Sequence, residues 1–94
     1  MATYILLSSL TDEGSKTIKS NPDRILQVNK EIEKLGAKVT AQFATLGIYD
    51  FVSVVEAKDN AAIARVSAEL GSRGSVKLTT LAAIPVEEFI KSLK

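Results

Sequence analysis

The stretch from Leu46 to Ala57 limits the possible folds more than any other part of the chain. A single glycine, Gly47, precedes an apolar, β-branched run that lies between two carboxylates, Asp50 and Glu56. Glycine between two strand-like segments is typical of a tight turn. We therefore expect a hairpin with a two-residue type II′ turn at Gly47-Ile48, followed by the most hydrophobic strand of a small sheet.

This turn fixes an expected register for the hairpin. It pairs Leu46 with Tyr49, Ala44 with Phe51 and Gln42 with Ser53, all on one face, because side chains along a strand alternate between faces. The opposite face would hold the remaining apolar side chains, Val39, Ala41, Phe43, Val52 and Val54. Asp50 and Glu56 would share that second face, about 20 Å apart at ~3.3 Å per residue, which is too far for both to act on one bond.

Two amphipathic helices are predicted on either side of this hairpin. The first starts at Asn21-Pro22, with Asn21 as the N-cap, and ends at Gly36 as the glycine after the last turn. Its apolar residues recur at spacings of three and four, as a half-buried helix requires. The second runs from Ala61 to about Ser72, with Ile63, Val66 and Leu70 turned inward.

The remaining segments complete the expected topology. Residues 3–10 and 75–84 read as strands, residues 11–20 as a polar loop with a helical turn, and residues 86–93 as a short helix after Pro85. The order strand, helix, strand, strand, helix, strand predicts an α+β fold. It is a ferredoxin-like βαββαβ domain over residues 1–94, with four antiparallel strands and both long helices on one face.

The other face of such a sheet would be uncovered. The expected register places Leu46, Tyr49, Phe51 and Val55 on it. An exposed apolar patch of this kind marks an interaction surface, and a second copy of the chain is the simplest cover. We therefore expect a homodimer or a higher homo-oligomer.

Several motifs resemble those of the GYD family. Gly47-x-Tyr49-Asp50 before the apolar strand is similar to the motif that names the family. Leu10-Thr11-x-Glu13-Gly14, Pro22-x-Arg24 and Gly74-x-Val76 follow the family pattern in the same order along the chain. The resemblance implies a dimeric α/β-barrel built from ferredoxin-like protomers, without an assigned biochemical role.

Composition excludes several kinds of chemistry. The chain has no cysteine and no histidine, so it lacks thiolate nucleophiles and the commonest metal ligands and general base. We expect neither a metal nor a cofactor. A net charge of +1 and the absence of tryptophan argue against a nucleic-acid partner. No apolar run approaches the ~20 residues that span a membrane, and the N-terminal residues do not resemble a secretory signal, so a cytoplasmic location is expected.

The candidate site residues are Asp50, Tyr49, Arg24, Lys19 and Tyr4. Asp50 has two alternative roles, as an acceptor for backbone N–H groups or a partner of Arg24, and as a general base in a pocket between sheet and helices. Tyr49 fits an interface aromatic better than a catalytic phenol. Lys19 and Arg24 lie near a helix start, where they can hold an anion or simply be solvated.

Two functions follow from these features. The first is a homo-oligomeric small-molecule-binding or assembly module. The alternative is a cofactor-free isomerase, decarboxylase or monooxygenase that uses Asp50 as its general base, an expectation that rests on analogy with other enzymes of this fold.

Overall fold

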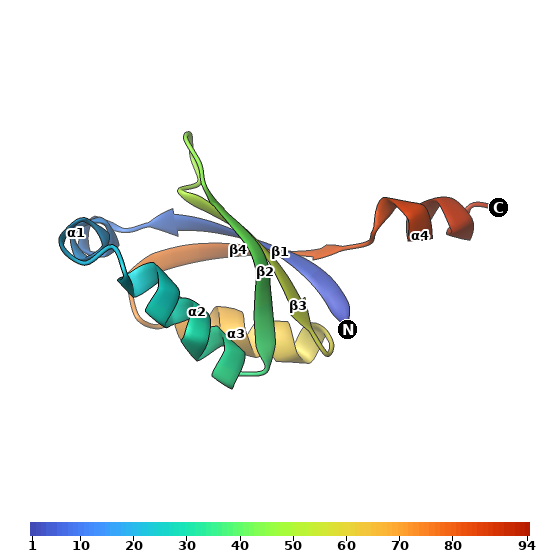
Figure 1. The fold of residues 1–94 in the computed structure, drawn as a ribbon, viewed down its shortest axis with the longest axis horizontal. Helices are drawn as coiled ribbons and strands as arrows, with labels where there is room; N and C mark the ends of the chain where they lie inside the picture. Colours follow the sequence, from blue (N-terminus) through green and yellow to red (C-terminus); the bar gives the residue numbers. More distant parts are fainter.

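The computed structural model describes residues 1–94 and contains one four-stranded antiparallel sheet in the order β2-β3-β1-β4. The elements follow the chain as β1 (Ala2–Leu10), α1 (Asp12–Ser20), α2 (Arg24–Lys34), β2 (Ala37–Ala44), β3 (Phe51–Ala57), α3 (Asn60–Gly71), β4 (Val76–Ala83) and α4 (Val86–Ser92). Helices α2 and α3 lie on the same face of the sheet (Figure 1). The predicted ferredoxin-like arrangement is confirmed.

The segment expected to be a polar loop is a helix, α1. Thr11 caps it, because its side chain accepts a hydrogen bond from the Gly14 N–H, and Asp12 and Glu13 place negative charge in its first turn. Gly14 is buried against the start of β4, where an added Cβ would lie 2.0 Å from the Ser75 carbonyl oxygen. Glycine at this position therefore lets α1 pack against the sheet.

Helix α2 begins later than predicted. Asn21 is the C-terminal cap of α1 and not the N-cap of α2, and its backbone N–H donates to the Thr17 carbonyl. The residue before α2, Asp23, makes no side-chain capping bond. The predicted end is confirmed, since Gly36 follows the last turn with φ = 99°, a value that glycine adopts at little cost.

The core lies between the sheet and these helices, on what we call the covered face. Tyr4, Leu6 and Val55 from the strands are at most 2% exposed. They belong to one apolar cluster with the inward side chains of α2 and α3, which are Ile32, Ile63, Val66 and Leu70. The predicted inward residues of the second helix are thus confirmed.

The predicted assignment of the two sheet faces is wrong for β3. Phe51 and Val55 belong to the covered face, whereas Val52 and Val54 lie on the opposite side, which we call the open face. The pairs Ala44–Phe51 and Gln42–Ser53 are confirmed, so the register is right and the faces are exchanged. Both faces of β3 are apolar, and hydrophobicity alone does not identify the side that the helices cover.

A β-bulge in β2 adds a second departure from the predicted pattern. The register shifts between Val39 and Ala41, and the Thr40 hydroxyl donates to the Val54 carbonyl at 3.2 Å. Because the bulge inserts one residue, Val39 lies opposite Val55 on the covered face, while Ala41 lies opposite Val54 on the open face. The alternation from Val39 to Phe43 therefore does not follow one face.

The turn of the hairpin is also longer than predicted. The strands end at Ala44 and Phe51, and the last bond of the ladder runs from the Thr45 N–H to the Asp50 carbonyl at 2.8 Å. Gly47 has φ = 108°, as expected for a glycine turn. The loop thus spans residues 45–50, and Leu46 and Tyr49 form no strand pair, in contrast to the two-residue turn that was expected.

Several apolar side chains are left without cover. On the open face, Phe43 on β2 and Leu81 on β4 are exposed. They lie on either side of the partly buried Ile5, Leu7 and Val54. Helix α4 extends away from the rest of the molecule (Figure 1), and all seven of its residues are exposed. No helix has the length and apolar character needed to cross a bilayer.

Candidate functional site

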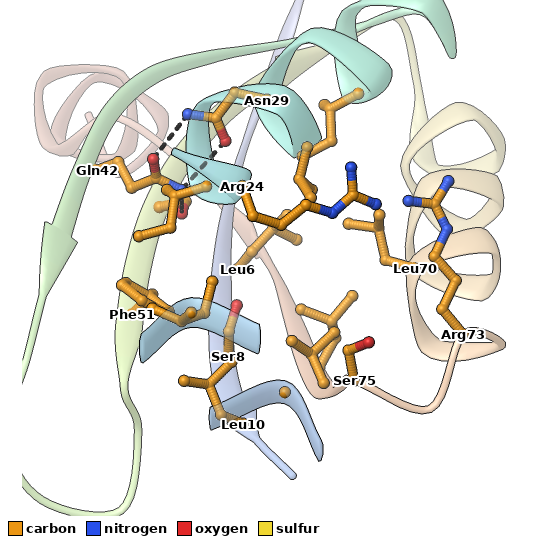
Figure 2. A pocket seen from close by; sticks show the side chains of 18 of the residues that line it. Leu6, Ser8, Leu10, Arg24, Asn29, Gln42, Phe51, Leu70, Arg73 and Ser75 are labelled. Atoms are coloured by element: carbon orange, nitrogen blue, oxygen red, sulfur yellow. Dashed lines mark hydrogen bonds between the residues drawn. The ribbon is translucent and has the colours of Figure 1, made fainter. Parts of the chain in front are cut away.

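A cavity of about 120 Å³, which we call the three-helix cavity, opens between the covered face of the sheet and the helices α1, α2 and α3. Its apolar lining comes from the strands through Leu6, Phe51 and Leu78, and from the helices through Ile32 and Leu70. Figure 2 shows these side chains around the space that they enclose. An apolar space with a few polar groups at its edge is typical of a small-molecule site.

One wall of the cavity is polar, but its side chains hydrogen-bond to one another. Asn29 Nδ2 donates to Gln42 Oε1 at 2.7 Å, and Gln42 Nε2 donates to Asn29 Oδ1 at 3.3 Å and to Ser53 Oγ at 3.1 Å. This network joins α2 to β2 and β3 (Figure 2). Both N–H groups of Gln42 are engaged, so the wall positions the two elements more than it offers donors to a ligand.

Two arginines lie at the mouth of the cavity, where their guanidinium groups point toward each other (Figure 2). Glu31 pairs with both, at 3.3 Å from Arg24 and in a short contact with Arg73, which also pairs with Glu69 at 3.3 Å. The hydrogen bond from Arg73 lowers the pKa of the Glu31 carboxyl, and Glu31 in turn raises the pKa of Arg73. Glu31 is therefore ionised near neutral pH.

Asp50 anchors the hairpin to β1. Its Oδ2 accepts the Leu10 N–H at 2.7 Å, and its own N–H donates to the Ser8 carbonyl at 2.7 Å. Two more bonds brace the loop, from the Thr45 hydroxyl to the Tyr49 carbonyl and from the Ser9 hydroxyl to the Ile48 carbonyl. Of the roles predicted for Asp50, the structure shows the one in which its carboxylate accepts a backbone N–H.

Asp50 is not part of the three-helix cavity. It is absent from the lining, and so are Tyr4 and Tyr49. The sheet places Glu56 on the open-face side of β3, contrary to the prediction that it faces the helices. Asp50 precedes the first residue of β3, and its carboxylate bonds to the backbone of β1. Glu56 lies opposite Lys38 and does not cap α3, whose cap is Asp59 through the Ala62 N–H. Asp50 lines neither this cavity nor the pocket between α3 and β4, so neither space supports its use as a general base.

The other candidate residues are scattered. Of the predicted site residues, only Arg24 lines the three-helix cavity. Tyr4 is almost fully buried, and its hydroxyl donates to Asn60 Oδ1 at 2.6 Å, at a second, shallower pocket between α3 and β4. Tyr49 is half-buried in the hairpin loop, and Lys19 is exposed in the last turn of α1. The sequence candidates therefore do not form one site.

The cavity also brings together three residues that were not among the predicted site residues, which are Ser8, Asn29 and Arg73. Arg73 carried the clearest available signal, since it follows Glu69 by four residues at the end of a helix. Its contact with Glu31, however, joins residues 42 positions apart. Only the folded topology places them side by side.

Comparisons with other proteins agree with this architecture. The GYD domain family matches residues 4–93. A protein of Thermus thermophilus named "Glutamine synthetase and cystathionine beta-lyase binding protein" is 56% identical over 95 residues, which cover 100% of both chains. The crystal structure of TTHA0845, also from Thermus thermophilus, matches with a TM-score of 0.57 and 23% identity, over 90% of this chain and 95% of that chain, and shows the same fold. The chain belongs to the GYD family.

Proposed function

We propose that this protein is a homo-oligomeric binding module that associates with metabolic enzymes, with glutamine synthetase and cystathionine β-lyase as the first partners to test. The observation that carries the proposal is the full-length relative, 56% identical, whose name states that it binds these two enzymes. The role of Asp50 as an acceptor for the Leu10 N–H, which anchors the hairpin, also supports a binding function. The cytoplasmic location expected from the sequence is part of the same proposal.

The open face is the proposed surface for self-association. Phe43 and Leu81 are exposed there, beside the partly buried Ile5, Leu7 and Val54. An apolar sheet face of this kind is stabilised when a second copy covers it, and a two-fold pair needs only one self-complementary surface.

The hairpin loop is the proposed contact for the partner enzyme. Leu46 and Ile48 are 101% and 81% exposed, although hydrogen bonds that involve Ser9, Thr45 and Asp50 hold the loop in place. Apolar side chains on a braced loop lose little conformational freedom on binding, which favours affinity. In this proposal, Gly47, Tyr49 and Asp50 of the GYD motif fix the conformation of the loop. Leu46 and Ile48 are then held where a partner can contact them.

Binding is tested with purified glutamine synthetase and cystathionine β-lyase from the same organism, by co-elution and by titration calorimetry. We expect the wild-type protein to bind at least one of them. The double variant Leu46→Ser/Ile48→Ser should weaken binding about tenfold or more, since hot-spot truncations cost at least ~2 kcal/mol. Leu26→Ser, on the exposed side of α2, is the matched control. No binding of either enzyme by the wild type at micromolar concentration would refute the proposal.

Self-association is tested separately by sedimentation. A species heavier than the 10.1 kDa protomer that Phe43→Asp converts to the protomer is the expected result. A wild-type protomer at all concentrations would remove the homo-oligomeric part of the proposal and leave enzyme binding to its own test.

A second function, binding of a small molecule in the three-helix cavity, is favoured by one specific observation. The cavity is bounded by side chains from three helices and all four strands, with a largely apolar lining. A thermal-shift screen of small metabolites tests it, and a cavity-filling Ser8→Leu variant should lose every shift that the wild type shows.

A further inference from the structure

We propose that the three-helix cavity takes a small apolar monocarboxylate, whose chain or ring fills the interior and whose carboxylate binds Arg24 at the mouth. The inference rests on the proposed small-molecule function and names its ligand class. It is carried by the size of the cavity, the chemistry of its walls and the unequal pairing of the two arginines.

The size of the cavity limits the apolar part of the ligand. Its volume is about 120 Å³, and a dry apolar cavity of ~150 Å³ is known to hold benzene. A branched chain or ring of about five or six carbons therefore fits. The side chains that surround this space, Leu6, Ile32, Phe51, Leu70 and Leu78, offer no hydrogen bonds.

Only a few polar groups of the lining are not already engaged in hydrogen bonds within the protein. The Asn29–Gln42–Ser53 wall uses its own donors. In contrast, the hydroxyls of Ser8 and Ser75 line the cavity (Figure 2) without a hydrogen bond to another protein group. Hydroxyl donors at this position can satisfy a ligand oxygen.

The two arginines differ in which of their side-chain N–H groups are already hydrogen-bonded. Arg73 is engaged twice, by Glu31 and by Glu69. Arg24 makes both of its side-chain hydrogen bonds through Nη1, to Gln27 at 3.4 Å and to Glu31 at 3.3 Å. Its Nε and Nη2 remain available, and together they form the planar edge that binds a carboxylate through two parallel hydrogen bonds.

The same pairing disfavours a cationic ligand. The carboxylates near the mouth, Glu31 and Glu69, are both bound to arginine. An ammonium group would have to break one of these pairs and approach two guanidinium charges. The site therefore selects against amines as well as for carboxylates.

The test uses three probes of the same shape, 4-methylpentanoate, 4-methylpentanamide and 4-methylpentylamine, titrated into the intact protein by calorimetry and followed by amide NMR. We expect the carboxylate to bind at least about tenfold more tightly than the amide, with no binding of the amine. Perturbed resonances should include those of Ser8, Phe51 and Leu78, which line the cavity.

Matched variants locate the carboxylate. Arg24→Gln should weaken 4-methylpentanoate about tenfold and leave the amide unchanged, while Arg65→Gln, an exposed arginine of α3, should change neither. Equal binding of amide and carboxylate, or unchanged binding by Arg24→Gln, overturns the ligand class while the cavity function stands. Absence of binding by all three probes and by the metabolite screen overturns both.

Discussion

The two faces of the sheet are built from similar apolar residues but have different environments. On the covered face, Leu6 and Val55 are enclosed by α2 and α3, and a cavity remains where these helices end. On the open face, the neighbouring residues Leu7 and Val54 have no helix above them. The comparison shows that the composition of a strand does not decide which of its sides is the core. That choice depends on where the helices attach.

The largest expected effect is a difference in stability loss between substitutions at two adjacent positions of β1, whose side chains lie on opposite faces. Leu6→Ala should destabilise the protein by about 3 kcal/mol, because it removes buried atoms and leaves a void. Leu7→Ala should cost about 1 kcal/mol or less in the protomer. Urea unfolding at two protein concentrations measures both. A Leu7→Ala loss that grows with concentration would show that the open face is buried between copies.

A second prediction measures how tightly α1 is packed on the covered side. Gly14→Ala should cost about 1–3 kcal/mol, because its Cβ would meet the Ser75 carbonyl. Gly71→Ala is the matched control, with open space around the added methyl group. The control should be neutral or stabilising by up to ~1 kcal/mol. Thermal unfolding compares the two, and equal losses would contradict the close contact.

A third prediction concerns the hairpin that rises beside the open face. Asp50→Ala should cost about 1–2 kcal/mol, because the Leu10 N–H loses its acceptor. Asp50→Asn should recover most of this loss, since its amide oxygen can still accept that bond. Hydrogen exchange of the Leu10 amide reports the bond directly. Protection that survives in Asp50→Ala would mean that the carboxylate is not the anchor.

The smallest expected effect is a pH dependence at the mouth of the cavity. The pKa of Glu31 is lowered in the folded protein by Arg73, so its contribution to stability is complete above the ordinary pKa and is lost as the pH falls below about 4.5. Because the Glu31 side chain is 34% exposed, we expect less than about 1 kcal/mol. The stability difference between wild type and Glu31→Gln should shrink on acidification, and a difference that grows would reverse the assigned sign.

The sequence was sufficient for the topology and for most of the register. Gly36 marked the end of a helix, and the spacing of Ile63, Val66 and Leu70 marked an inward stripe. Centring the hairpin on Gly47-Ile48 gave the correct pairing of Gln42 with Ser53, although the loop is longer than the predicted turn. Such features depend on local conformational preference and on side-chain period, which the sequence contains directly.

Which sheet face is covered, and where the cavity forms, could not be predicted without the tertiary structure. The bulge at Thr40 has no signal in the alternating pattern of β2, and α1 was hidden by its polar composition, although Thr11 and its acidic first turn are helix-start signals. The Arg24–Glu31–Arg73 cluster joins residues from two helix ends. Its formation depends on how the helices pack, which local preference does not specify.

The bulge at Thr40 makes the two borders of the sheet unequal. It interrupts β2, which forms one border, whereas the opposite border is the regular strand β4. A kinked border presents its outward N–H and C=O groups out of line and resists the addition of a foreign strand. Another chain that extends this sheet is therefore expected to pair with β4. The pairing would stop at Pro85, which has no backbone N–H to donate.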